Sequence, residues 1–206
     1  MSKLIITIAR SYGSGGRTMG KLLAQELGIK YYDREILRLA SDESGINEAL
    51  FGKADEKLKS TSLFRIAKKA YHGELIPPES DEFASNDNLF NYQAKVIKDL
   101  ANEESCVIIG RCADYILKDN PDVIRLYCYA PLEDCIKREQ AQSSLCEKEI
   151  IKKIQKIDKY RAEYYKYYTN RDWNDARNYD FCINTASMSY EQLIAAVKAY
   201  IEIYKK

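Results

Sequence analysis

The sequence predicts a three-layer α/β/α fold with a five-stranded parallel sheet at its centre. Short apolar runs, which are typical of buried parallel strands, alternate with amphipathic helical patterns along the chain. A segment rich in glycine joins the first apolar run to the first helical pattern. At 206 residues, the chain can bury about 70% of its unfolded surface without disulfides or metals to stabilise it. We therefore expect a single domain over residues 1–206.

The chain begins with a strand, a loop and a helix. The apolar run 4–8 precedes the glycines, and apolar residues then recur at helical spacing over 18–27, up to Gly28, which is suited to end a helix. A second strand is predicted over 29–33, and a helical pattern follows it. This strand ends in a carboxylate, Asp33. We expect Asp33 at the edge where open parallel sheets bind their ligands.

Residues 41–88 are polar and show weak helical periodicity. We expect helical pieces around 55–71, whereas the pair Pro77 and Pro78 predicts a loop. The mixed polarity after this pair indicates a mobile segment. Two interpretations stay open, an insert that covers or binds a substrate and a surface elaboration.

The second half of the chain continues the alternation of helices and strands. An amphipathic helix over 88–101 leads into the continuous apolar run 106–110, which is typical of a central parallel strand and is followed directly by Arg111. A long charged helix over 147–168 carries an isoleucine stripe on one face and basic residues on another. The remaining elements are a short helix over 113–118, strands over 123–129 and 179–185, a helix that opens at Pro131, and a final helix with Ser189 as its N-cap.

Composition narrows the classes of function. The chain has 32 Lys and Arg against 31 Asp and Glu, so it lacks the basic field that would indicate nucleic acid or an anionic membrane as a partner. Its six cysteines form no C-x-x-C pair, and its single histidine, His72, argues against a zinc site or a His-based triad. We find no signal-peptide layout and no apolar run near the roughly 18 residues of a membrane span. We expect a cytoplasmic protein with reduced thiols.

The loop after the first strand predicts a phosphate site. Three of the residues 13–16 are glycines, which let backbone N–H groups turn toward a ligand. The helix that begins near Thr18 points its positive end at the same place. The P-loop template G-x-x-x-x-G-K-[ST] matches here at Gly16 and Thr18, with Ser11 in place of its first glycine and Arg17 in place of its lysine. A glycine-rich turn without a ligand is the alternative.

Four stretches carry a resemblance that spans nearly the whole chain. They are the loop 13–17, the run 27–33, the segment 107–114, and the pairs Tyr179-Asp180 and Asn184-Thr185. Together they resemble the cytidylate kinase-like family of P-loop nucleoside monophosphate kinases. In cytidylate kinases the loop is similar to G-x-x-G-x-G-K-G-T, and the central strand ends in D-G-R. In this sequence Ile109 takes the position of that Asp. When residues 13–15 are aligned with the family loop, Gly16 takes the position of the lysine.

The resemblance implies ATP as phosphoryl donor, Mg²⁺ as cofactor, and a helical lid over residues 147–178 that closes over the transferring group. Phosphoryl transfer needs backbone N–H groups and cations to neutralise charge on the moving group. The implied roles are catalysis for Arg17, Arg111, Arg161 and Arg171, phosphate binding for Gly13, Ser14, Gly15, Gly16, Arg17 and Thr18, acceptor binding for Asp33, Arg38 and Arg111, and metal binding for Thr18 and Asp114.

Structural alternatives stay open at several of these positions. Asp33 could cap the helix after it, and Arg161, Arg171 and Lys159 could simply be solvated. The tyrosine cluster 164–168 favours packing over base stacking. Trp173 either stacks on a base or anchors the lid.

We expect ATP-dependent transfer of a phosphoryl group to a nucleoside monophosphate, with CMP or dCMP first among the acceptors by resemblance. One alternative is a regulatory protein that binds nucleotides without turnover, motivated by Ile109 and by the position of Arg17. Another is a kinase of a different small metabolite, which the polar segment 41–88 permits. The expected partners are small-molecule nucleotides, with neither nucleic acid nor membrane among them.

Overall fold

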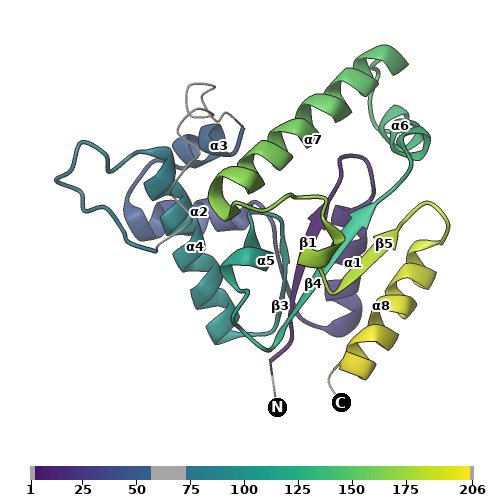
Figure 1. Ribbon diagram of the computed structural model, residues 1–206, viewed down its shortest axis with the longest axis horizontal. Coiled ribbons are helices and arrows are strands. Elements are labelled where there is room, and N and C mark those ends of the chain that lie inside the picture. Colours follow the sequence, from purple (N-terminus) through teal and green to yellow (C-terminus); the bar gives the residue numbers. More distant parts are fainter. Residues whose placement is uncertain (1–2, 57–72, 205–206) are drawn as a thin grey trace.

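Five parallel strands form one sheet at the centre of the computed structural model, which describes residues 3–56 and 73–204 (Figure 1). The strands lie in the order β2-β3-β1-β4-β5, and every neighbouring pair is parallel. Their bounds are Ile5–Arg10 for β1, Lys30–Tyr32 for β2, Cys106–Ile109 for β3, Val123–Tyr129 for β4 and Phe181–Asn184 for β5. The predicted five-stranded parallel sheet is confirmed.

Helices cover both faces of the sheet and complete the three predicted layers. One cluster of buried side chains joins one face to α1 and α8, and another joins the opposite face to α2, α3, α4, α5 and α7. The bounds are Gly16–Leu27 for α1, Glu35–Ser44 for α2, Glu48–Glu56 for α3, Asn86–Glu103 for α4, Ala113–Ile116 for α5, Leu132–Gln140 for α6, Glu147–Thr169 for α7 and Tyr190–Tyr204 for α8.

The core shows why the central strands have continuously apolar sequences. In β3, Cys106 and Ile108 pack toward one helical layer, whereas Val107 and Ile109 pack toward the other, and all four are fully buried. A parallel sheet between two helical layers buries both of its faces. Each fully buried valine or isoleucine contributes about 1.5–3 kcal/mol. The carboxyl ends of the strands are therefore held on a rigid base.

The elements beside the loop differ slightly from their predicted bounds. β1 continues to Arg10, which pairs with Cys128 of β4. α1 begins at Gly16, after Gly15 has taken a left-handed conformation. The predicted end of α1 is confirmed, because Gly28 is its C-cap with φ 64°. Arg10, the first cation of the loop region, therefore belongs to the sheet.

The polar segment 41–88 contributes to the core in part. α2 extends to Ser44, and in α3 the ring of Phe51 is fully buried against the cluster that includes α2 and α4. The predicted loop at Pro77 and Pro78 is confirmed, since neither residue belongs to a helix or strand. Most of the helical region predicted around 55–71 lies outside the described residues, as does His72.

Helix α7 lies at the upper end of the view in Figure 1, on the same side as the loop between β1 and α1. The hydroxyl of Tyr160 donates to the carbonyl oxygen of Ala54 at 2.7 Å, and that of Tyr165 donates to the carboxylate of Asp114 at 2.6 Å. These bonds hold the C-terminal half of α7 against α3 and α5. The N-terminal half packs with α6 through a cluster that includes Ile150.

The structure also describes the helix lengths, the cysteines and the groups of metal-ligating side chains. None of the helices in the described part of the chain is long and apolar enough to cross a membrane. The cysteines are free thiols, four of them buried, whereas Cys146 is exposed and Cys182 is partly exposed. Within residues 3–56 and 73–204, no group of three or more His, Cys, Asp or Glu side chains could hold a metal ion.

Candidate functional site

A cleft of about 1190 Å³ opens beside the carboxyl ends of β1 and β3 and is bordered by α1, α2, α3 and α7. A crevice at this edge is the usual ligand site of an open parallel sheet. The predicted site residues that line the cleft are Gly13, Gly15, Gly16, Arg17, Thr18, Asp33, Arg111, Asp114 and Arg161. The fold thus brings most of the predicted residues into one place.

The loop needs glycine at two positions. Gly13 has φ 75° and Gly15 has φ 79°, a left-handed conformation that residues with a Cβ adopt at a cost. The space around them is also filled. A Cβ on Gly13 would lie 2.9 Å from the Cβ of Cys135, and a Cβ on Gly15 would lie 2.7 Å from the hydroxyl oxygen of Tyr190. The loop conformation is therefore fixed by the surrounding fold.

Side chains behind the loop bind its carbonyl oxygens. Arg138 of α6 donates from Nη1 to the carbonyl oxygen of Ser14 at 2.9 Å and from Nη2 to that of Thr185 at 2.7 Å. Ser14 itself is fully buried, and both its hydroxyl and its N–H donate to the carbonyl of Ser11. Ser14 therefore holds the loop together from inside and lies away from the cleft surface. The sequence predicts Ser14 as a phosphate ligand because it lies among the loop glycines, and the sequence does not indicate that its side chain is buried.

The first turn of α1 lies at the cleft and carries the positive end of the helix. The helix begins at Gly16, and its N-cap, Gly15, makes no side-chain hydrogen bond to the first N–H groups. Arg17 and Thr18 in this turn are exposed and line the cleft. The N–H of Gly16 donates to Oγ of Ser14 at 3.4 Å, and the positive end of the helix favours a phosphate beside this turn.

Asp33 joins the loop to the end of β3. Its carboxylate pairs with Nε of Arg17 at 2.8 Å and with Nη1 of Arg111 at 3.5 Å. The alternative that Asp33 caps the following helix is wrong, because α2 begins at Glu35 and its N-cap is Arg34. Two predicted phosphate-binding cations therefore share one carboxylate at the centre of the cleft.

The backbone at the end of β3 is strained. Gly110, Arg111 and Cys112 all have left-handed φ angles, of 70°, 53° and 53°. For residues with a Cβ this conformation costs of order 1–2 kcal/mol each. The strain turns the chain sharply out of the sheet, so that the side chain of Arg111, only 8% exposed, reaches Asp33. Strain of this kind is concentrated at functional sites.

Arg10, at the last position of β1, lines the same cleft, although the sequence analysis gave it no role. Burial, and after it the charge of Arg161, lowers the pKa of Arg10 to about 9, although the charge of Asp33 acts in the opposite direction. Arg161 donates from Nη1 to the carbonyl oxygen of Arg10 at 3.0 Å. The signal that could have found Arg10 is the one that found Arg111, a cation directly at the end of a buried apolar strand.

The loop is also tied to α7 at Tyr12. Its N–H donates to the carboxylate of Asp158 at 2.8 Å, and its hydroxyl donates to Glu139 of α6 at 3.1 Å. The guanidinium carbon of Arg161 lies 5.7 Å from the centre of the Tyr12 ring. Helix α7 is therefore in direct contact with the loop.

Asp114 has surroundings that differ from those of a metal ligand. Its side chain is buried and accepts the 2.6 Å hydrogen bond from Tyr165. Burial raises the pKa of Asp114 to about 6, although the bond from Tyr165 acts in the opposite direction. Burial thus shifts Asp114 toward its neutral form, whereas Mg²⁺ binds ionised carboxylates. The role of Asp114 as a metal ligand stays a prediction that this environment does not favour.

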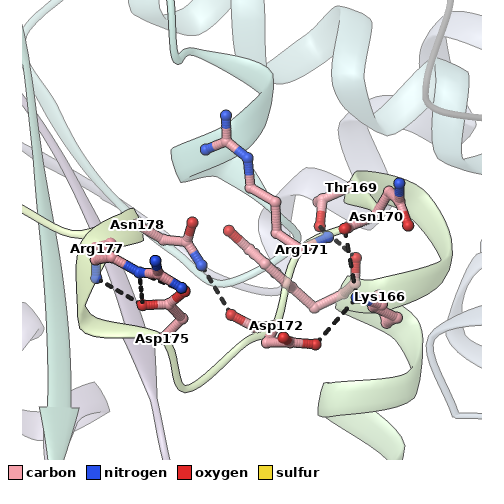
Figure 2. Close-up of polar contacts among 9 residues, drawn as sticks. Lys166, Thr169, Asn170, Arg171, Asp172, Asp175, Arg177 and Asn178 are labelled. Atoms are coloured by element: carbon pink, nitrogen blue, oxygen red, sulfur yellow. Dashed lines mark hydrogen bonds and ion pairs between the residues drawn. The ribbon is translucent and has the colours of Figure 1, made fainter.

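Three predicted cations lie outside the cleft lining. Arg38 is exposed and pairs with Asp42 at 3.0 Å, because it lies one helical turn farther from the end of β2 than Arg34, which does line the cleft. Lys159 is 77% exposed on the outer face of α7. Figure 2 shows the side chain of Arg171 pointing away from Asp172, which contacts Lys166 and Asn178. Its guanidinium carbon lies 5.2 Å from the ring of Tyr115.

The aromatic residues serve mainly as packing. Phe90 stacks on Tyr168 with ring centres 3.8 Å apart, and Tyr164 packs edge to face against both. The predicted packing role of the tyrosine cluster is confirmed. Trp173 is buried, meets the ring of Tyr127 edge to face at 5.7 Å and also lines the cleft. This contact anchors Trp173 to the sheet.

Known proteins with similar sequences are kinases by name. A relative from Pyrococcus horikoshii, named cytidylate kinase, is 27% identical over 201 residues that cover 97% of this chain and 89% of the relative. A relative of the same name from Methanosarcina barkeri is 26% identical and covers 96% of each chain.

Solved structures show the same fold. An uncharacterized protein from Eubacterium ventriosum, 28% identical, has a TM-score of 0.70 and covers 97% of this chain and 99% of its own. Shikimate kinase from Bacteroides thetaiotaomicron is 13% identical, with a TM-score of 0.55 over 97% of this chain and 98% of its own, and it shares the fold alone.

The family assignment rests on a match over most of the chain. The family model described as the cytidylate kinase-like family matches residues 5–187. With this match and the kinase fold, the chain is a kinase-like phosphotransferase. It belongs to the cytidylate kinase-like family.

Proposed function

We propose that the protein transfers the γ-phosphoryl group of ATP to a nucleoside monophosphate, with CMP or dCMP as the first candidate acceptor. The observation that carries this proposal is the gathering of four arginines in the cleft. Arg17 and Arg111 pair with the carboxylate of Asp33, and Arg10 and Arg161 line the same cleft beside them. A surplus of positive charge in a cleft favours a ligand with several negative charges. Phosphoryl transfer requires such neutralisation of the moving group.

The choice of acceptor draws on the relatives. Several of them, from 22% to 27% identical, are named cytidylate kinase and are covered along almost their whole length. The cleft continues from Asp33 toward α2 and α3, where Arg34, Leu37 and Glu48 line it. A cation, an apolar side chain and a carboxylate in one wall suit a phosphorylated ligand with a polar ring.

The two ends of the cleft take different substrates in this proposal. The donor phosphates bind at the loop and the first turn of α1, and the acceptor phosphate binds between Arg111 and Arg34. Asp33 orients Arg111 and Arg17 toward the group in transfer. Arg161 reaches the same place from α7 and supplies a further positive charge.

The donor set fits a Mg²⁺ ion that arrives with the nucleotide. Mg²⁺ commonly keeps several waters and binds through substrate phosphates with only one or two protein ligands. Thr18, exposed in the first turn of α1, would supply a hydroxyl oxygen. Asp33, the predicted carboxylate at the end of β2, is already paired with two arginines. When bound, the ion would neutralise charge on the donor phosphates.

Only part of the predicted lid closes over the substrates in this proposal. The C-terminal half of α7 is bound to α3 and α5 by hydrogen bonds of Tyr160 and Tyr165. The N-terminal half carries Lys153 and Lys156, which line the cleft, and it packs mainly with α6. We propose that α6 and this half of α7 move together to exclude water.

A coupled assay of ADP release tests the proposal. ATP and Mg²⁺ are held constant, and CMP, dCMP, UMP, AMP and GMP are supplied in turn. We expect acceptor-dependent ADP release that is greatest with CMP or dCMP. ATP binding without acceptor-dependent release would support the regulatory alternative. Release with a non-nucleotide phosphoryl acceptor alone would instead identify a kinase of another metabolite.

A further inference from the structure

The backbone of the loop identifies which residue stands at the P-loop lysine. The family loop G-x-x-G-x-G-K-G-T has two glycines, one residue apart, directly before its lysine. In this loop Gly13 and Gly15 have left-handed φ angles, and glycine adopts that conformation without steric cost. Aligning these glycines with the template puts Gly16 at the lysine. Arg10 then stands at the first glycine, and Arg17 at the glycine after the lysine.

Arg10 and Gly16 depend on each other sterically. A Cβ on Gly16 would lie 2.8 Å from the Cβ of Arg10 and 2.8 Å from that of Cys128. Both distances are shorter than real Cβ contacts. The space from which a side chain at position 16 would start is therefore filled from the sheet. Any side chain at position 16 would collide in this backbone with the Cβ atoms of positions 10 and 128, so this position of the loop cannot supply a cation.

We propose that Arg10 does the work of the missing P-loop lysine by binding the β- and γ-phosphates of the donor nucleotide. This inference rests on the proposed function and names the donor-binding cation. The side chain of Arg10 runs from the loop toward the end of β3, where a Cβ on Gly110 would collide with its Nη1. Its guanidinium thus lies between the loop and the strand end that carries Arg111.

The other arginine of the loop is less suited to this role. Arg17 has a side chain that is 56% exposed, and its Nε is engaged with Asp33. Arg10 lies deeper in the cleft. Burial and the charges of neighbouring arginines lower the pKa of Arg10, so the protein alone holds this cation at a cost in free energy. A polyphosphate in the cleft would remove that cost.

Binding measurements on Arg10 variants test the inference. Isothermal titration would compare ATP, ADP and CMP on the wild-type protein, Arg10→Met and Arg10→Lys. We expect Arg10→Met to weaken the binding of ATP and ADP by at least about 30-fold, because a charge-assisted contact is lost. The affinity for CMP should change by less than about 3-fold. Arg10→Lys should keep part of the affinity for ATP. Guanidinium ion at millimolar concentration should restore ATP affinity to Arg10→Gly. Arg177→Met, an exposed arginine outside the cleft, is the matched control.

The outcomes separate the inference from the proposed function. If wild-type protein binds ATP and Arg10→Met binds it equally well, the inference is overturned and the proposed function stands. The same holds if CMP affinity falls while ATP affinity is kept, because Arg10 would then serve the acceptor. If Arg10→Met fails to fold, Arg10→Lys and the guanidinium rescue decide the question. Wild-type protein that binds neither nucleotide overturns both proposals.

Discussion

The carboxylate of Asp33 lies 2.8 Å from Nε of Arg17, which connects the end of β2 to the first turn of α1. The same carboxylate pairs with Arg111 at the end of β3. Three sequence segments far apart in the chain thus meet at one side chain that is 10% exposed. Arginines outnumber carboxylates here before any ligand arrives, because Arg10, Arg17 and Arg111 share Asp33, whereas Arg161 pairs with Asp158 at 3.3 Å.

Replacing Asp33 by Asn should lower the melting temperature more in the absence of polyphosphate than in its presence. The charge of Asp33 offsets repulsion among Arg10, Arg17 and Arg111. Because Arg17 is exposed, we expect a loss of about 1–2 kcal/mol, or a few degrees for a chain of this size. Thermal unfolding with and without inorganic tripolyphosphate measures the difference.

The exposed pair of Arg38 and Asp42 supplies the control for this experiment. Asp42→Asn should change stability by no more than about 0.5 kcal/mol, with or without tripolyphosphate. An equal fall in both variants, insensitive to tripolyphosphate, would show that Asp33 acts only as an ordinary ion pair.

Replacing Arg111 by Ala should reduce kcat/KM by at least about 100-fold, because the loss of a charged transition-state contact costs roughly 3 kcal/mol. Arg111 is held by Asp33 and by a strained backbone, so it is pre-oriented for this contact. Steady-state kinetics with ATP and the acceptor found in the ADP-release assay measure the effect. Arg38→Ala, outside the cleft lining, should stay within about 3-fold of wild type. A loss of only about ten percent in Arg111→Ala would make Arg111 structural.

The sequence predicts the sheet well because buried parallel strands have continuous apolar runs, as in β3. It predicts Arg111 and Asp33 in the cleft because each follows a predicted strand, and the carboxyl ends of parallel strands share one edge. It misses Arg10 because β1 continues past the apolar run that ends at Ile8. The glycines instead place the predicted phosphate site at the residues that follow Arg10.

Three other predicted site residues do not line the cleft, for a different reason. Arg38 is on the correct helix but one turn too far along it, and it binds Asp42 instead. Arg171 follows α7 closely in sequence, yet its guanidinium packs over Tyr115. Ser14 lies within the loop, but it is fully buried. In each case the deciding fact is the direction of a side chain in the tertiary structure, which spacing alone does not give.

Replacing Arg138 by Met should raise the KM for ATP by about 10-fold or more, with a smaller effect on the KM for the acceptor, as expected for the loss of charge-assisted hydrogen bonds. Arg138 donates to the carbonyl oxygens of Ser14 and Thr185 and so fixes the loop from behind. Initial rates with each substrate varied in turn separate the two constants. Lys137→Met, the neighbouring position on α6, is the control. Equal changes in both KM values would contradict a role confined to the donor loop.

Replacing Asp114 by Asn should remove a pH dependence of stability. Burial raises the pKa of Asp114 from 3.8 to about 6, so between these values the folded protein holds more protons than the unfolded chain. Stability contributed by this group is therefore present below about pH 4 and is lost as pH rises through 6, a change of about 3 kcal/mol. Relative to wild type, Asp114→Asn should gain stability between pH 4 and pH 7.5. Urea unfolding at both values tests this, and a constant difference between the two proteins would contradict it.

Replacing Gly52 should separate helix stability from acceptor binding. Gly52 lies within α3 and lines the cleft, and a Cβ there would have no described atom within 4 Å. Because glycine costs about 0.5–1 kcal/mol relative to alanine inside a helix, Gly52→Ala should raise the melting temperature by about 2–4 °C. Gly52→Leu should fill the space beside the acceptor and raise the KM for the acceptor by about 10-fold, as a steric loss of roughly 1.4 kcal/mol would give, with the KM for ATP unchanged.

The adjacent residue provides the control for Gly52. Lys53 lies in the same helix and outside the cleft lining, so Lys53→Leu should leave both KM values unchanged. A raised KM for the acceptor in both variants would point to a change in α3 as a whole. If Gly52→Leu raises the KM for ATP instead, the donor and acceptor ends of the cleft are reversed from those proposed, because a side chain at this position can obstruct only the ligand that lies against α3.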